Sequence, residues 1–434
     1  MPAPLAAELP SRRRRLLQGL GASAALVVAD EGAEVYEGER RSNLSSDLYY
    51  LTGWTGRGAA LIRPLAEQTF VLFIDPRDRP QEAVTGPRPG LDEAKEQFGA
   101  DEALPFRELE AHLGWMCEGH ASLHYAYGHN PGADQRVLRA LRDGRRSASR
   151  SGAVSPTRIE HAGELIGELR LRKDAAEVAA IRAAGRITAE AHTFAMRAGR
   201  PGVREYAMEA LVDGTFRGRG GSGGGYDTIV GGGANACVLH YSANDAELRD
   251  GDLCLVDAGC RFAHYTADVT RTWPVNGRFS GPQRALYEVV HAAWATAVAQ
   301  VRVGGSWVGM RDAALRVLCE GLVALELVEG DVDTVIQEER YRRFYPHEIG
   351  HWLGLDVHDP GGFFAGGRSR RFEVGQVLAV EPGLYVRPDD EDAPPAFRGL
   401  GVRIEDDLLV TEAGAEVLTD CPRTLEDVEA ATGR

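Results

Sequence analysis

A handful of acidic and histidine residues in the C-terminal half stand on or beside apolar segments, where a charge is costly. Asp257 closes the apolar run 253–256, which predicts a buried strand. Asp268 lies within a second β-like run, 265–273. A buried carboxylate needs a cationic partner. The same half of the chain supplies further polar groups in similar settings, namely His351, Glu381 and Glu405.

Four carboxylates and one imidazole cannot share a cavity without compensating charge. Two like charges about 4 Å apart repel by roughly 4 kcal/mol at an effective dielectric of about 20. Two divalent cations would offset four negative charges, and this donor set suits Mn²⁺ but also Co²⁺, Zn²⁺ or Fe²⁺. Two such metals can activate water to hydrolyse an acyl bond, for example a peptide. Judged by pattern alone, salt-bridged aspartates and a packed histidine remain an equally good interpretation.

The residues next to these groups favour extended backbone. Pro382 biases Glu381 toward an extended conformation. In the stretch 402–405, strand alternation places Arg403 and Glu405 on one face. His351 and a second histidine, His358, bracket a turn-rich segment.

The rest of this half predicts helices packed outside a curved antiparallel sheet, an α+β half-barrel. Asp174 and Glu177 fit a capping box at the start of the first helix. Further helices are predicted over 203–217, 282–300 and 308–327, and strands over 226–230, 238–241, 252–274, 376–381, 383–387, 401–410 and 416–419. The strand 238–241 carries His240. The glycine-rich stretch 218–225 lacks a following Lys-Ser/Thr and a helix, so we interpret it as a connection and not as a phosphate loop.

The N-terminal part alternates short strands and helices, which predicts a smaller α/β domain over residues 1–165. Strands are expected at 24–29, 50–53, 59–62 and 69–74, and helical pieces at 93–97 and 106–112. Residues 145–158 are rich in Ser, Arg and Gly and are interpreted as a loop or linker before a second domain, 166–434. The run 11–17 has the outline of a twin-arginine export signal, but a short basic helix before the first strand is the favoured interpretation.

Composition excludes several classes of protein. The chain has 434 residues, a net charge of −15 and 44% hydrophobic residues, as in a globular protein of two domains. The acidic balance disfavours nucleic acid and anionic membrane as partners, and no apolar run is long enough to span a bilayer. Six cysteines without a CxxC pair are interpreted as reduced thiols, which predicts a cytoplasmic protein.

Six motifs in order resemble the proline-specific branch of the "pita-bread" metallopeptidases, and closely the aminopeptidase P family of bacteria. The motifs are the segments 239–241, 256–260, 267–272, 351–359, 380–385 and 402–407. The resemblance runs from about residue 170 to 418 and is weaker in the N-terminal domain. It implies a pita-bread catalytic domain and release of the N-terminal residue from peptides with proline second.

The resemblance also implies roles for individual residues. Asp257 would chelate one metal, His351 and Glu381 the other, and Asp268 and Glu405 would bridge a pair of divalent ions, most simply Mn²⁺. A metal-bridging hydroxide would attack the carbonyl, with Glu381 moving a proton to the proline nitrogen. His358 and His240 would steady the carbonyl and the oxyanion, His347 and Tyr385 would line the proline pocket, and Arg403 would support the bridging carboxylates.

Two departures from the family pattern limit these expectations. Gly224-Gly225 stands where the family usually has a proline and a small residue, and the segment 42–47 matches only loosely. In this family the N-terminal domain restricts the cleft and contributes to contacts in a homo-oligomer, here expected to be a dimer or tetramer. A prolidase, which cleaves only Xaa-Pro dipeptides, is the alternative enzyme. A non-catalytic pita-bread module that binds peptides is the alternative from another class.

Overall fold

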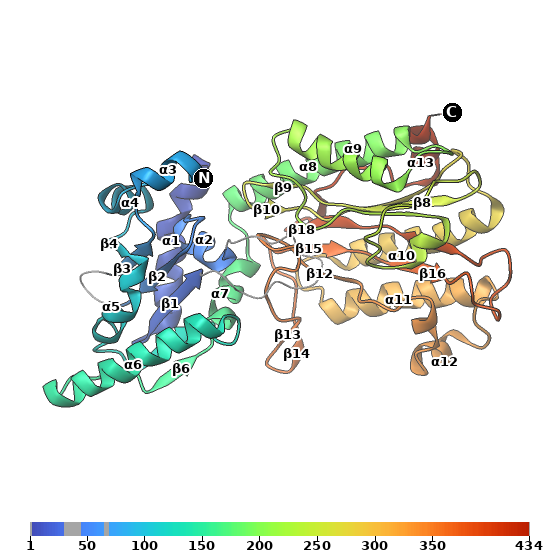
Figure 1. Cartoon of the computed structure of the whole chain (residues 1–434). Helices are drawn as coiled ribbons and strands as arrows, with labels where there is room; N and C mark the ends of the chain where they lie inside the picture. The colour runs from blue at the N-terminus through green and yellow to red at the C-terminus, as the bar shows by residue number, and fades with distance from the viewer. Residues whose placement is uncertain (1, 30–44, 65–68, 434) are drawn as a thin grey trace. The chain divides into compact units, whose positions relative to one another are not determined.

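The computed structural model describes residues 2–29, 45–64 and 69–433. The chain forms two compact units that meet in sequence at Arg170 and Leu171, and each is described by itself (Figure 1). The division after residue 165, with the functions assigned to each side, stays a prediction. Residues 42–44 of the loosely matching segment lie outside the described residues.

The first unit is built on a six-stranded sheet of order β4-β3-β2-β1-β5-β6. β1 runs antiparallel to β2 and parallel to β5, so the sheet is mixed. Its strands are β1 Ala24–Ala29, β2 Gly58–Ile62, β3 Phe70–Ile74, β4 Glu102–Pro105, β5 Ser122–Tyr125 and β6 Arg158–Glu160. Its helices are α1 Ala3–Leu20, α2 Ser46–Thr52, α3 Arg79–Thr85, α4 Leu91–Phe98, α5 Leu109–Met116, α6 Pro131–Ser151 and α7 Ala162–Leu171. The expected strands β1, β2 and β3 are confirmed.

Two predictions in this unit were wrong. The segment 50–53 belongs to helix α2, because the Ser45 hydroxyl caps the amide of Leu48 and Gly53 ends the helix in a left-handed conformation. Residues 145–151 continue helix α6, whose buried stripe uses small residues, including Gly144 and Ala148. A Cβ on Gly144 would lie 2.6 Å from the carbonyl oxygen of Gly114, so the close packing of α6 on α5 requires glycine at this position. Small residues on the buried face weaken the hydrophobic period by which a helix is predicted.

The basic run near the N-terminus lies in α1 and is packed. Arg12 is fully buried, with its guanidinium 4.6 Å from the centroid of the Tyr50 ring. Arg13 donates to the Leu51 carbonyl at 2.9 Å. Both arginines therefore fasten α1 to α2.

The second unit places its strands between two groups of helices, with α8 and α9 on one side and α10 and α11 on the other (Figure 1). β11-β8-β7 and β12-β15-β18-β19 form two sheets, and β16 pairs with β17. The helices are α8 Ala175–Ala198, α9 Glu205–Gly218, α10 Gly281–Gln300, α11 Trp307–Ala324, α12 Val332–Gln337 and α13 Leu425–Thr432. The main strands are β7 Ile229–Gly232, β8 Leu253–Asp257, β11 Thr270–Pro274, β12 Gly350–Trp352, β15 Val377–Val380, β16 Gly383–Val386, β17 Leu400–Arg403, β18 Asp406–Thr411 and β19 Gly414–Val417. Short strands are β9 Arg261–Phe262, β10 Tyr265–Thr266, β13 Phe364–Ala365 and β14 Arg368–Ser369. The α+β prediction is confirmed.

Three predicted strands needed correction. Residues 238–241 form a turn after a short 3-10 helix, Gly233–Cys237, and Val238 is 53% exposed instead of buried. The run 265–273 is divided into β10 and β11, and 401–410 into β17 and β18. Asp268 and Glu405 lie in these two breaks. The polar groups that interrupt the strands are therefore the ones predicted to carry the chemistry.

Candidate metal centre

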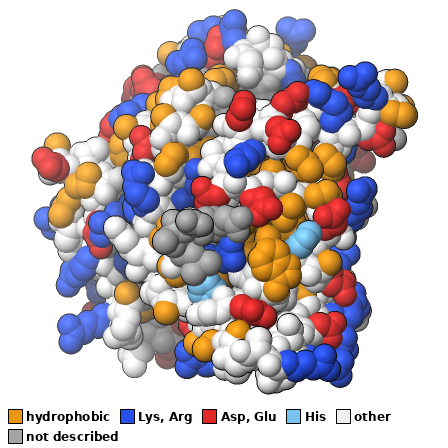
Figure 2. All heavy atoms as spheres, turned by 90° about the vertical axis from the view of Figure 1, so that its left-hand side faces the viewer, with side chains coloured by type: hydrophobic (Ala, Val, Ile, Leu, Met, Phe, Trp, Pro, Cys, Tyr) orange, Lys and Arg blue, Asp and Glu red, His pale blue; other side chains and the backbone are white. Residues whose placement is uncertain are grey.

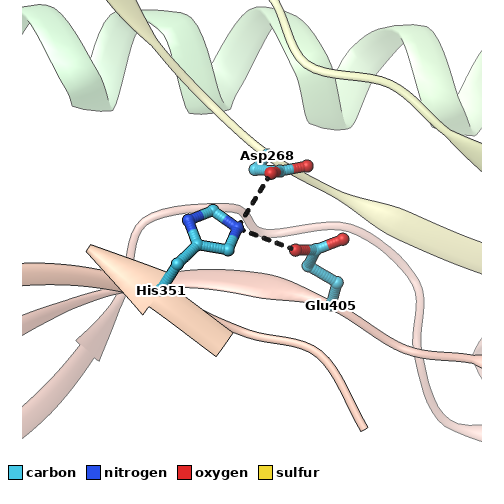
Figure 3. A group of neighbouring side chains, drawn as sticks. All are labelled: Asp268, His351 and Glu405. Atoms are coloured by element: carbon cyan, nitrogen blue, oxygen red, sulfur yellow. Dashed lines mark ion pairs between the residues drawn. The ribbon is translucent and has the colours of Figure 1, made fainter. Parts of the chain in front are cut away.

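Three segments that are distant in sequence bring Asp268, His351 and Glu405 together (Figure 3). One ligand atom from each lies within 4.8 Å of the others. His351 Nε2 is 3.3 Å from Asp268 Oδ2 and 4.0 Å from Glu405 Oε1. The exposed fractions of Asp268 and Glu405 are only 5% and 2%, so these charges are held away from water.

Glu381 and Asp257 lie next to this cluster. Glu381 follows β15, and its Oε1 lies 3.9 Å from His351 Nε2. Asp257 ends β8, directly opposite Thr270 in the antiparallel pair β8–β11. Its Oδ2 accepts from Arg403 Nη2 at 2.5 Å. The five residues predicted as metal ligands thus line one buried region, with Arg403 at its edge.

Hydrogen bonds from outside the cluster fix the direction of its side chains. His351 Nδ1 donates to the Trp352 carbonyl at 3.1 Å, which leaves Nε2 directed at the carboxylates. The Thr270 hydroxyl donates to Glu405 Oε2 at 2.7 Å. The backbone amide of Asp268 donates to Asp407 Oδ2 at 3.0 Å. Such support is typical of a preformed ligand set.

The electrostatics of the cluster call for added positive charge. Burial raises the pKa of Glu405 well above its usual value, and the charges of Asp268 and Glu381 add to the increase. Burial likewise raises the pKa of Glu381 to about 7, although His351 and Arg403 oppose it. Burial would lower the pKa of His351, but the hydrogen bond and charge of Asp268 raise it to about 9. Without a cation, protons must neutralise these groups.

Metal binding should therefore release protons. Because its pKa is raised to about 9, His351 carries a proton at pH 7 in the metal-free protein, and the raised pKa of Glu381 keeps part of that carboxyl protonated. A cation binds only the deprotonated forms, so affinity should rise from about pH 6 to pH 9. Calorimetric titration with Mn²⁺ in buffers of different ionisation enthalpy should show release of at least one proton per protein. Binding without proton release would contradict this charge balance.

Tyr226 is a site residue that sequence reasoning missed. Its hydroxyl contacts Asp257 Oδ1 at 2.6 Å and also Asp268 Oδ1. A Cβ on Gly259 would lie 3.0 Å from the Tyr226 ring and 1.7 Å from the Ala267 carbonyl oxygen. In the sequence, the one sign of this contact was Gly259, two residues after Asp257, because a residue without a side chain leaves room for the Tyr226 ring next to the carboxylates.

Replacing Tyr226 with phenylalanine should weaken metal binding by about 10- to 100-fold, the usual cost of losing a partner of a metal ligand. The phenol orients two carboxylates with one hydroxyl, and phenylalanine keeps only the ring. Metal content after dialysis against graded Mn²⁺ measures the effect. Tyr206→Phe, at a tyrosine that is 56% exposed, is the matched control. If both variants bind Mn²⁺ with the same affinity, Tyr226 does not support the metal ligands.

Three further predicted residues, His358, His347 and Tyr385, lie around this cluster, whereas His240 is exposed in the turn after the 3-10 helix. The His358 ring lies 4.4 Å from that of His351, centroid to centroid, at an angle of 82°. His347 Nε2 lies 2.9 Å from the Tyr385 hydroxyl, which also accepts from Arg403 Nη1 at 3.0 Å. Burial lowers the pKa of His347 to about 3, and the charge of Arg403 adds to the decrease. His347 is therefore a neutral hydrogen-bonding group at pH 7.

The donor set fits divalent metal ions. It offers carboxylate oxygens and one imidazole nitrogen, with Asp268, His351 and Glu405 buried and Asp257 and Glu381 partly buried. This is the ligand chemistry of Mn²⁺, Co²⁺ and Zn²⁺. The local excess of negative charge is what a cation would neutralise. The arrangement can therefore hold metal and hydrolyse a bond beside it.

A curved α+β unit with such a centre defines a hydrolase of the metallopeptidase class, and comparison with known proteins agrees. The model of metallopeptidase family M24 matches residues 179–412, more than half of the chain, and the chain belongs to this family.

The similarity extends to one branch of the family. The model of the aminopeptidase P N-terminal domain matches residues 10–124. Xaa-Pro aminopeptidase of Escherichia coli is 40% identical over 429 residues, covering 98% of this chain and 97% of that protein. The structure of Pseudomonas aeruginosa aminopeptidase PepP superposes with a TM-score of 0.92 at 41% identity, over 98% of both chains. Mouse Xaa-Pro dipeptidase is 38% identical over 61% of this chain and 60% of its own length. The resemblance and the pita-bread fold expected from the motifs are confirmed.

Proposed function

We propose that this chain is a metal-dependent aminopeptidase that releases the N-terminal residue from peptides with proline in the second position. The observation that carries the proposal is the buried cluster of Asp268, His351 and Glu405, whose ligand atoms converge within 4.8 Å. The end-to-end similarity to an Xaa-Pro aminopeptidase favours this activity over that of a prolidase, whose relative aligns over 61% of the chain.

Five side chains would hold two divalent ions. Asp257 would bind one ion, His351 and Glu381 the other, and Asp268 and Glu405 both. The bound ions would supply water activation and polarisation of the scissile carbonyl. We favour Mn²⁺ because oxygen donors predominate, and Co²⁺ or Zn²⁺ are the other candidates.

The protein's own groups would move the proton and hold the substrate. Glu381 has its pKa raised to about 7 by burial in the metal-free protein, against the opposing charges of His351 and Arg403. Its carboxylate would take a proton from water and pass it to the leaving proline nitrogen. His358 and His240 would donate hydrogen bonds to the substrate carbonyl and its developing oxyanion.

Outside the metal ligands, His347 and Tyr385 would form the wall of the proline pocket. Arg403 would keep Tyr385 and Asp257 in position, because its guanidinium donates to both side chains. The N-terminal domain, residues 1–165, would restrict the cleft and contribute contacts to a homo-oligomer, a dimer or tetramer.

The proposed setting is the cytoplasm, with peptides as partners and neither nucleic acid nor membrane. All six cysteines are unpaired thiols, which suits a reducing compartment. No helix in the described residues has the length and apolar content of a membrane span. On the face drawn in Figure 2, basic and acidic side chains are interspersed, which does not favour a polyanion.

Metal add-back tests the proposal. Protein stripped of metal should not cleave Xaa-Pro-Yaa tripeptides, and Mn²⁺ should restore release of the first residue. Xaa-Ala-Yaa tripeptides should remain uncleaved. Bound metal without release would point to another substrate, and failure to bind metal would support a non-catalytic peptide-binding module.

A further inference from the structure

Glu205, the first residue of α9, is a buried carboxylate outside the metal cluster. Its exposed fraction is 0%. Oε1 accepts from the Gly232 amide at 2.7 Å and from Asn235 Nδ2 at 3.0 Å. Oε2 accepts from the Tyr241 hydroxyl at 2.9 Å and from the Ala246 amide at 2.8 Å. One carboxylate thus uses its full acceptor capacity on a single stretch of chain.

That stretch, residues 232–246, is called the His240 loop below. A second carboxylate of α9, Glu209, lies one turn after Glu205 and therefore on the same helix face. Glu209 Oε2 accepts from Asn244 Nδ2 at 2.9 Å. Asn244 has a φ of 45°, and its Oδ1 accepts from the Val230 amide at 2.9 Å. Side-chain hydrogen bonds to α9 therefore hold a loop that has little regular secondary structure.

The His240 loop lies against strands that carry site residues. Ala236 packs with Leu255 and Tyr385, and Leu255 is two residues before Asp257 on β8. Cys237 Sγ lies 3.4 Å from the Val386 carbonyl oxygen on β16. The loop therefore has one side on α9 and the other beside the centre.

His240 occupies the part of the loop that Glu205 holds most closely. It precedes Tyr241 directly, and Tyr241 and Asn235 share a hydrogen bond of 3.0 Å beside the carboxylate. Burial chiefly lowers the pKa of His347 and His358, and the charge of His240 adds to both decreases. Leu239, directly before His240, packs against the cluster of Ala236, Leu255 and Tyr385, so this part of the loop lies beside the proposed proline pocket.

We infer that Glu205 is a positioning residue that fixes the loop carrying His240 beside the proposed site. This inference rests on the proposed function, in which His240 contacts the substrate carbonyl. The carboxylate itself touches no reacting atom. Instead, four hydrogen bonds to the buried carboxylate would fix the conformation of the loop. His240 would then contact the substrate without the entropy cost of ordering the loop first.

Glu205→Gln tests the inference. Glutamine keeps the shape and one acceptor oxygen, but its amide group cannot accept, so the backbone amide of either Gly232 or Ala246 loses its acceptor. We expect kcat/KM on an Xaa-Pro-Yaa tripeptide to fall about tenfold, on the scale of one lost hydrogen bond. Mn²⁺ content should not change, because no proposed ligand lies in the loop. Amide hydrogen exchange over 232–246 should become faster.

A double-mutant cycle separates positioning from general stability. In a His240→Ala background, Glu205→Gln should cost nothing more in kcat/KM, because its effect passes through the missing imidazole. The same tenfold loss in both backgrounds, or no loss in either, would overturn the inference. Glu247→Gln, at an exposed glutamate directly after the loop, is the matched control.

A milder variant covers the case in which Glu205→Gln fails to fold. Tyr241→Phe removes one of the four donors and should cut kcat/KM by a few-fold, again only when His240 is present. Equal effects with and without His240 would contradict positioning. If the unmodified protein cleaves no Xaa-Pro peptide, the proposed function fails. If the protein is active but amide exchange in Glu205→Gln is unchanged, only the positioning inference is contradicted.

Discussion

Asp268→Ala should abolish turnover and weaken the binding of both metal ions. The carboxylate lies in the break between β10 and β11, in contact with His351 on one oxygen and Tyr226 on the other. If it bridges the two ions, its removal takes a ligand from each. We expect activity to fall by more than about 10³-fold, the scale of losing a metal function, and metal content to drop below two ions per chain.

Asp268 also has a structural contact that alanine keeps, because its backbone amide donates to Asp407. The fold should therefore survive, and far-UV circular dichroism should match that of the unmodified protein. Asp312→Ala, at an exposed aspartate on α11, is the control for loss of a negative charge. Full metal content and rate in Asp268→Ala would contradict the ligand assignment.

His358→Ala should leave metal bound but reduce kcat by about 10²–10³, as when an oxyanion stabiliser is lost. Burial lowers the pKa of His358, and the charge of His351 adds to the decrease. The imidazole is thus neutral at pH 7 and can still donate a hydrogen bond. Alanine removes that donor without touching a proposed ligand.

The comparison of kcat with metal content makes this prediction specific. His358 packs at a right angle on His351, so a purely structural role would change metal affinity as well as rate. His129→Ala, at an exposed histidine of the first unit, is the control. A rate near that of the unmodified protein, or metal loss equal to the rate loss, would argue against the oxyanion role.

The most successful predictions from the sequence concerned charged residues within or next to apolar strand segments. Asp257 at the end of an apolar run does end a buried strand, and Arg403 and Glu405 do face the same region. The first prediction rests on a run of apolar residues and the second on strand alternation, although Glu405 itself lies in the break between β17 and β18. The helix starting after Asp174 was equally predictable, because its capping box is formed in the structure.

Errors arose where distant groups decided local structure. The turn at 238–241 has strand-like residues, but it ends at Tyr241, whose hydroxyl donates to Glu205, 36 positions earlier in the chain. Tyr226 joins the site because Gly259 leaves space for its ring. Neither the contact of Glu205 with the turn nor that of Tyr226 with Gly259 produces a hydrophobic period or a local propensity. A single sequence therefore gives little indication of them.

The central claim concerns substrate, and one measurement tests it most directly. The protein, loaded with Mn²⁺, would be given an Xaa-Pro-Yaa tripeptide and the matching Xaa-Pro dipeptide, and release of the first residue followed for both. We predict a higher kcat/KM for the tripeptide. Cleavage confined to the dipeptide would contradict the account and identify a prolidase instead.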